Sequence, residues 1–167
     1  TGARDFPVTT GPGPAGSADT FATRLSVDGS ALAYSRYLGG NSWDYGEAIL
    51  VGPDDGLYVV GSTYSTNWPG QHGSVDQFVV SLTPAGVWDW NLTLGGTGGD
   101  QAWGGAIDAA GHVYTSGPLL GAGGVVAVDG HQGWRADGLR TLGEDDGPAA
   151  RGAGVGDQLV SRSGGRL

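Results

Sequence analysis

The sequence contains no cysteine, no methionine and no lysine among its 167 residues. Without cysteine the chain can form neither disulfides nor thiolate metal sites. A chain without methionine is expected to be a processed protein or an excised piece of one. No apolar stretch is long enough to span a membrane, so no membrane-spanning segment is predicted.

Positive charge is scarce and unevenly placed. All eight cations are arginine, and none lies between Tyr37 and Trp134, where nine acidic residues fall. Phosphate binding requires a cationic face, so nucleic acid is not predicted as a partner. We interpret the net charge of −9 as a source of solubility, with a surface for cations or cationic partners as the alternative.

Glycine is abundant, with 35 residues, yet the apolar residues are not scattered as they are in disordered chains. They form short runs, such as residues 57–60 and 78–80, separated by Gly, Asp, Ser and Pro. No stretch of ten or more residues keeps a helical period free of Gly or Pro. Short apolar runs bounded by turn residues predict an all-β fold.

An internal repeat covers most of the chain. Its first copy begins at Asp19-Thr20-Phe21, and its second begins 57 residues later at Asp76-Gln77-Phe78. The offset falls to 56 after the turn that follows Gly29 or Gly86, as a loop deletion would produce. The later matched pairs are Leu38 and Leu94, Gly39 and Gly95, Asp44 and Asp100, Val51 and Ile107, Tyr58 and Tyr114, and Gly61 and Gly117.

The repeat divides the whole segment, residues 1–167, into four parts. Residues 1–18 match the end of a preceding unit, and residues 19–63 form the first clear copy. Residues 76–117 form the second clear copy. Residues 118–167 are predicted to be a degenerate third copy, with Val125–Val128 as one of its strands.

Each copy is predicted to contain four short strands. Several strands are apolar on both faces, which predicts sheets stacked on similar sheets, as in a partial β-propeller of about three four-stranded antiparallel blades. Closed propellers have about four to eight blades, so we expect further blades or self-association. The expected strands are 20–26, 31–38, 47–51 and 57–63 in the first copy, and 76–82, 87–94, 104–108 and 112–117 in the second.

A tight hairpin turn is predicted at residues 53–56, because Pro53 fixes φ, Asp caps the turn locally, and Gly56 tolerates positive φ. Residues 109–111 are predicted to form the matching turn in the second copy. Both turns join the last two strands that we expect in their copies.

Several elements together resemble the bacterial β-propeller repeat called SBBP. They are Phe78–Leu82, Tyr-Leu-Gly-Gly at 37–40, Asp-Tyr-Gly at 44–46, and residues 57–63 followed by Trp-Pro at 68–69. The resemblance covers nearly all of residues 1–117, although the second copy has Thr93 in place of the tyrosine. It implies a secreted or cell-surface bacterial protein with many repeats, and it implies neither catalytic residues nor cofactors.

The candidate binding residues are Trp43, Asp44, Asp100 and Trp103. Each tryptophan lies close to one of the two matched aspartates, in segments predicted as loops. Aromatic side chains beside carboxylates are typical of carbohydrate sites, and anchoring of the loops is the alternative interpretation.

Trp68 is predicted to pack in the core. Trp88 and Trp90 alternate with Asp89 and are therefore predicted to share one face, where they either pack between blades or form an exposed stacking platform.

No catalytic or metal-binding constellation is predicted. His72, His112 and His131 have no spacing suited to a metal, and no serine lies in a nucleophile-elbow motif. The adjacent acids at 54–55 and 144–146 are predicted to lie in turns, with calcium conceivable at the second. No cofactor is expected.

The predicted function is a non-catalytic scaffold or binding module of a secreted or cell-surface protein, presenting loops at one end of the blades. A carbohydrate-binding propeller is the first alternative. The second is a fragment of a propeller hydrolase whose active site would be supplied largely by other blades.

Overall fold

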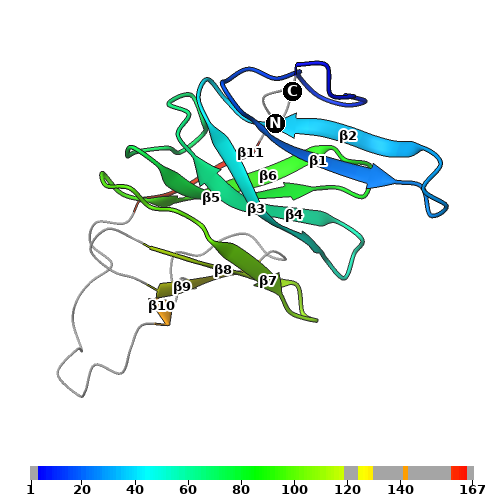
Figure 1. Ribbon diagram of the computed structural model, residues 1–167. Coiled ribbons are helices and arrows are strands. Elements are labelled where there is room, and N and C mark those ends of the chain that lie inside the picture. The colour runs from blue at the N-terminus through cyan, green and yellow to red at the C-terminus, as the bar shows by residue number, and fades with distance from the viewer. Residues whose placement is uncertain (1–3, 119–123, 130–140, 143–158, 165–167) are drawn as a thin grey trace.

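A computed structural model describes residues 4–118, 124–129, 141–142 and 159–164 of the chain. These residues contain eleven strands and no helix, and every strand pair is antiparallel (Figure 1). The prediction of an all-β fold is therefore confirmed. The strands form three separate sheets, which do not close on one another within the described part of the chain.

The central sheet has five strands in the order β11-β6-β5-β4-β3. Four of them follow one another along the chain as a meander, and β11 adds to the outer edge by pairing with β6. The strands are β3 (Asp44–Val51), β4 (Leu57–Thr63), β5 (Asp76–Leu82), β6 (Trp88–Gly95) and β11 (Leu159–Gly164).

A smaller sheet lies on either side of the central one (Figure 1). On one side, β1 and β2 form a two-stranded sheet in which Thr20 is opposite Leu38. On the other side lies a four-stranded sheet in the order β10-β9-β8-β7. These strands are β1 (Thr20–Leu25), β2 (Leu32–Leu38), β7 (Gly104–Ile107), β8 (His112–Gly117), β9 (Gly124–Asp129) and β10 (Thr141–Leu142).

The boundaries between the sheets lie two strands away from the boundaries between the copies of the sequence repeat. The first copy supplies β1 and β2 to one sheet but β3 and β4 to the next, and the second copy is divided in the same way. The predicted grouping of one copy into one four-stranded sheet is therefore wrong. The physical reason is that β4 pairs along its whole length with β5 across the loop at 64–75, whereas β2 and β3 are not paired.

Both faces of the central sheet are covered by apolar packing, as the two-sided apolar strands predict. One face joins the four-stranded sheet through Val113, while the other joins the two-stranded sheet through Tyr34. The first cluster contains Tyr58, Val60, Val79, Trp90, Leu92, Leu94, Ala102 and Val113. The second contains Ala22, Tyr34, Leu38, Leu57, Val59, Trp68, Phe78, Val80 and Leu82.

Trp88 and Trp90 lie on opposite faces, so the prediction that they share one face is wrong. The register shifts between Ser81 and Leu82, which are paired with Trp90 and Trp88. The extra residue inverts the alternation of side chains, as a β-bulge does. Trp90 consequently packs in the first cluster, and Trp88 packs against the second, where its ring centroid lies 5.7 Å from that of Trp68.

The predicted hairpin turns are present, with one difference in the residue that takes the left-handed conformation. In the turn between β3 and β4 that residue is Asp55, at φ 60°, rather than Gly56. The matching residue between β7 and β8 is Gly111, at φ 90°. Asp54 supports the first turn by accepting a 3.2 Å hydrogen bond from the Gly56 N–H. Glycine is used at the left-handed position only in the second copy.

Candidate functional site

Asp44 begins β3 at the junction between the two-stranded and central sheets. Its side chain is buried, and both carboxylate oxygens accept hydrogen bonds. Oδ1 accepts from the Thr63 hydroxyl at 2.5 Å, and Oδ2 accepts from the Ser65 hydroxyl at 2.7 Å and the Gly40 N–H at 2.8 Å. The carboxylate is therefore engaged in holding three chain segments together and is not presented to solvent.

Asp100 has the matching position in the second copy. It is also buried, and its Oδ2 accepts a hydrogen bond from the Gly96 N–H at 2.8 Å. The backbone matches as well, because the Asp44 N–H donates to Ala18 O at 2.7 Å, and the Asp100 N–H donates to Val75 O at the same distance. The two candidate aspartates are thus equivalent parts of one repeated network.

A second buried aspartate accompanies each of these residues. Asp19 accepts a hydrogen bond from the Ala15 N–H at 2.9 Å, and Asp76 accepts one from the His72 N–H at 2.6 Å. Asp76 is completely buried. The sequence showed both residues as matched positions, but it assigned them no role. Their recurrence at the start of each copy, 19 and 18 residues before the Leu of the Leu-Gly-Gly element, was the signal that could have identified them.

The first glycine of the Leu-Gly-Gly element is explained by these carboxylates. A Cβ atom on Gly39 would lie 2.0 Å from Asp19 Oδ1, and one on Gly95 would lie 2.1 Å from Asp76 Oδ1. Neither position has room for a side chain while the aspartate is in place. Glycine is required here by close approach and not by backbone conformation.

Burial raises the pKa of two carboxyl groups in this network. For Asp44, desolvation outweighs the hydrogen bonds from Thr63, Gly40 and Ser65, which lower the pKa. For Asp76, desolvation again has the largest effect and raises the pKa. The negative charge of the neighbouring aspartate in the same copy also raises each pKa. That neighbour is Asp19 for Asp44 and Asp100 for Asp76. The network therefore favours the protonated form of these carboxyls relative to exposed aspartates.

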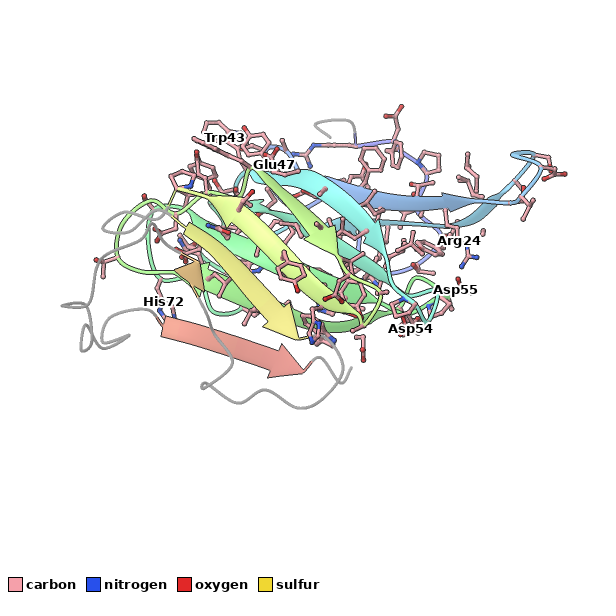
Figure 2. All side chains as sticks on the ribbon, turned by 90° about the horizontal axis from the view of Figure 1, so that it is seen from below. Arg24, Trp43, Glu47, Asp54, Asp55 and His72 are labelled. Atoms are coloured by element: carbon pink, nitrogen blue, oxygen red, sulfur yellow. The ribbon has the colours of Figure 1, made fainter. Side chains whose placement is uncertain are left out.

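The two candidate tryptophans, in contrast, are exposed. The exposed fraction is 49% for Trp43 and 72% for Trp103. The Trp43 ring meets Tyr64 edge to face, with 6.3 Å between ring centroids, and Tyr64 OH accepts a 2.7 Å hydrogen bond from Gln101 Nε2. In Figure 2, Trp43 lies at the end of the molecule opposite Asp54 and Asp55.

The structure thus separates the four candidate residues by role. Asp44 and Asp100 lie inside the sheet junctions, whereas Trp43 and Trp103 present aromatic surface to solvent. A sugar that stacked on either ring would not reach the Asp44 carboxylate without breaking its hydrogen bonds. Any binding at this end would therefore depend on the aromatic rings and the loop backbone.

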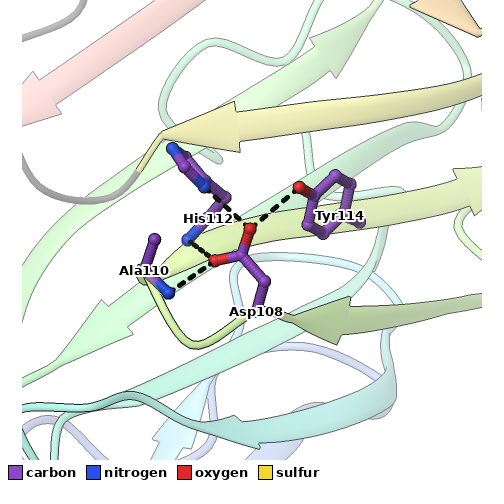
Figure 3. A network of polar contacts seen from close by, with 4 residues as sticks. All are labelled: Asp108, Ala110, His112 and Tyr114. Carbon is purple, nitrogen blue, oxygen red and sulfur yellow. Dashed lines mark hydrogen bonds and ion pairs between the residues drawn. The ribbon is translucent and has the colours of Figure 1, made fainter.

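A polar network closes the turn between β7 and β8 (Figure 3). Asp108 Oδ2 lies 2.8 Å from His112 Nδ1 and accepts a 3.0 Å hydrogen bond from Tyr114 OH, while Oδ1 accepts from the Ala110 N–H at 2.9 Å. These bonds lower the pKa of Asp108 to about 2, the bond to His112 being the largest cause. The network is a turn cap, in which His112 is a structural partner of Asp108.

The remaining acid–base residues form no metal centre in the part of the chain that the structure describes, where no group of three or more His, Asp or Glu side chains converges. His131 and the acidic residues 144–146 lie outside the described residues. Among the described residues, no helix is long and apolar enough to cross a membrane. Comparisons with protein-family models and with curated proteins found no match to this chain.

Proposed function

We propose that this chain is a non-catalytic β-propeller segment of a secreted or cell-surface bacterial protein, acting as a scaffold whose loops bind partners. The observation that carries the proposal is the repeated junction between sheets. Asp44 and Asp100 occupy the same place at two successive junctions, and each is fixed by a backbone bond to the segment that leads into the first strand of its copy. A junction that recurs along the chain supports an assembly in which further sheets are added by the same contacts.

The two-stranded sheet indicates where another unit would join. Val51 is 62% exposed, although its match in the second copy, Ile107, packs against the first core cluster. Ile49 is 53% exposed on the same strand and lines a cavity of about 640 Å³ with Phe21 of β1. In the second copy the edge of β5, which matches β1, is paired with β4. Strands equivalent to β3 and β4 would therefore complete the two-stranded sheet and cover these residues.

Analytical ultracentrifugation of the isolated chain tests this proposal. We expect the wild-type chain to associate, because exposed apolar residues beside an unpaired strand edge favour self-association. Val51→Asp should shift the distribution towards monomer. Val27→Asp is the matched control, since Val27 is fully exposed in the turn after β1 and does not line the cavity of about 640 Å³. A wild-type chain that stays monomeric at all concentrations would contradict the proposal.

Carbohydrate binding remains a second candidate function because two large aromatic rings, Trp43 and Trp103, are exposed. Their faces would stack on sugar rings, as exposed tryptophan does in many binding sites. A glycan array on the wild-type chain and on Trp103→Ala separates the two functions. Binding that is lost in the variant supports a carbohydrate site, while an array without binding leaves only the scaffold.

A further inference from the structure

Arg36 is a buried cation at a position that the second copy of the repeat fills with an apolar residue. Its match is Leu92, which is completely buried in the first core cluster. Arg36 is only 6% exposed, and its neighbours on the same face of β2, Tyr34 and Leu38, belong to the second cluster. A guanidinium thus takes the place of a core side chain.

Within the described residues, the guanidinium is held by one hydrogen bond and by aromatic contact. Nη1 donates to Gly86 O at 2.8 Å, and the guanidinium carbon lies 5.6 Å from the centroid of the Trp88 ring. Nε is buried and has no hydrogen-bond acceptor among the residues that the structure describes. In the described part of the chain, no carboxylate lies within ion-pair distance of Arg36. A buried charge without a counter-charge is costly, which suggests that the charge is kept for a ligand.

Arg36 lines a pocket of about 430 Å³ between the two-stranded sheet and the central sheet. Trp88 and Val87 form its wall on the central sheet, and Pro69 lies beside them. The opposite side is formed by the segment that contains Pro12. This volume is within the range of small-molecule sites, which are typically largely apolar with a few polar groups that fix the ligand.

The segment over the pocket is positioned by the chain itself. The Thr9 and Thr10 N–H groups donate to Ser35 O at 2.8 and 3.2 Å, which ties this segment along β2. Gly11 then takes a left-handed conformation, at φ 80°, and a Cβ there would lie 3.0 Å from Arg36 Nη2. Because Gly11 has no side chain, the backbone of this segment lies directly against the guanidinium.

We propose that this pocket binds a small organic carboxylate with an apolar or aromatic body. Guanidinium matches a carboxylate in a two-bond geometry, and the Nε donor of Arg36 has no acceptor among the described residues. The apolar body would lie against Trp88 and Pro69, which line the same pocket. The site is distinct from the exposed tryptophans at the sheet ends, and it does not depend on the proposed scaffold function.

Isothermal titration calorimetry with benzoate tests the proposal, with benzamide as the uncharged ligand of the same shape. We expect saturable benzoate binding to the wild-type chain and at least tenfold weaker binding of benzamide. Arg36→Leu introduces the residue found at the matching position of the second copy, so the fold should be retained by circular dichroism. In this variant benzoate binding should fall at least tenfold, while Arg36→Lys should retain part of it.

The outcomes that would overturn the proposal are specific. Equal binding of benzoate and benzamide would show that the charge is not recognised, and unchanged benzoate binding in Arg36→Leu would place the site elsewhere. Binding of inorganic phosphate as tight as benzoate would indicate an unselective anion site. Tighter binding of glucuronate would show that the body of the ligand is a sugar. An absence of any saturable binding would show that the buried arginine is structural.

Discussion

Gly95→Ala tests the close contact between the Leu-Gly-Gly element and the buried aspartate. The new Cβ would lie 2.1 Å from Asp76 Oδ1, 2.7 Å from its Cγ and 3.0 Å from Asp100 Oδ2. Asp76 is completely buried and cannot swing into solvent. The carboxylate must therefore shift away from its hydrogen-bond donors.

The cost can be worked from the bonds that this shift breaks. Asp76 Oδ2 accepts from the His72 N–H at 2.6 Å and more weakly from the Gly73 N–H at 3.4 Å. A hydrogen bond to a charged group contributes about 1.5–3 kcal/mol, and a buried donor left unsatisfied adds to the loss. We expect Gly95→Ala to lower the free energy of unfolding by about 2–4 kcal/mol, measured by urea denaturation followed by circular dichroism.

Two further variants isolate the contact. Gly104→Ala is the matched control on β7, because no atom lies within 4 Å of its added Cβ, and it should be neutral or stabilising by up to about 1 kcal/mol. In an Asp76→Ala background, Gly95→Ala should cost less than about 1 kcal/mol, since the clashing carboxylate is gone. A Gly95→Ala variant as stable as Gly104→Ala would refute the reasoning.

Three other measurements probe the core and the carboxylates. Phe78→Ala, at a completely buried position, should cost about 3–5 kcal/mol in urea denaturation, and a loss below about 1 kcal/mol would contradict its place in the core. Because the folded-state pKa of Asp76 is raised, stability should increase as the pH falls through that pKa towards the ordinary value of 3.8, and Asp76→Asn should lack this increase in urea titrations between pH 7 and 4. The pKa of Asp108 is lowered to about 2, so its contribution is present above pH 3.8 and is lost as the pH falls towards 2. Asp108→Asn should therefore show a shallower loss of stability in that acid range, and an unchanged acid titration would exclude the turn network as the cause.

The strands were predictable because each is a short apolar run between turn residues. The expected ranges 57–63, 76–82 and 112–117 coincide with β4, β5 and β8. The start of β3 was missed, because its first residues, Asp44 and Gly46, are polar or small and resemble a loop. A pattern of apolar residues identifies the strand segments that are buried in the core. It does not identify a strand end whose residues are polar and are buried by hydrogen bonds.

The same pattern could not predict which strands pair with one another, or on which face of the sheet Trp88 lies. A repeat gives the order of strands but not the point at which one sheet ends, since either grouping buries the same residues. The bulge opposite Leu82 depends on the register in which β6 pairs with β5. Asp55 likewise takes the left-handed conformation although Gly56 is beside it, because the turn's register decides which residue lies there.

The candidate site was predicted in its residues but not in its chemistry. Asp44 and Asp100 were identified because they recur at matched positions, and recurrence is equally expected of structural and binding residues. What separates the two is burial, which the sequence does not show for a polar residue near a turn. Arg36 was missed for the opposite reason. Its match in the second copy is Leu92, and a search for recurring residues does not select positions where the two copies differ.

The buried aspartates also explain how successive sheets keep a fixed relation. Apolar packing between sheets is non-directional and permits sliding and rotation. Hydrogen bonds have defined distances and angles, and a fully engaged buried network tolerates little displacement. Asp44 bonds through its backbone to Ala18, in the segment that leads into β1, and through its side chain to Thr63 of β4, so the step between the two sheets is set at this residue. Because Asp100 makes the matching backbone bond one copy later, the same step is repeated, and the apolar clusters then fill the space that the carboxylates have defined.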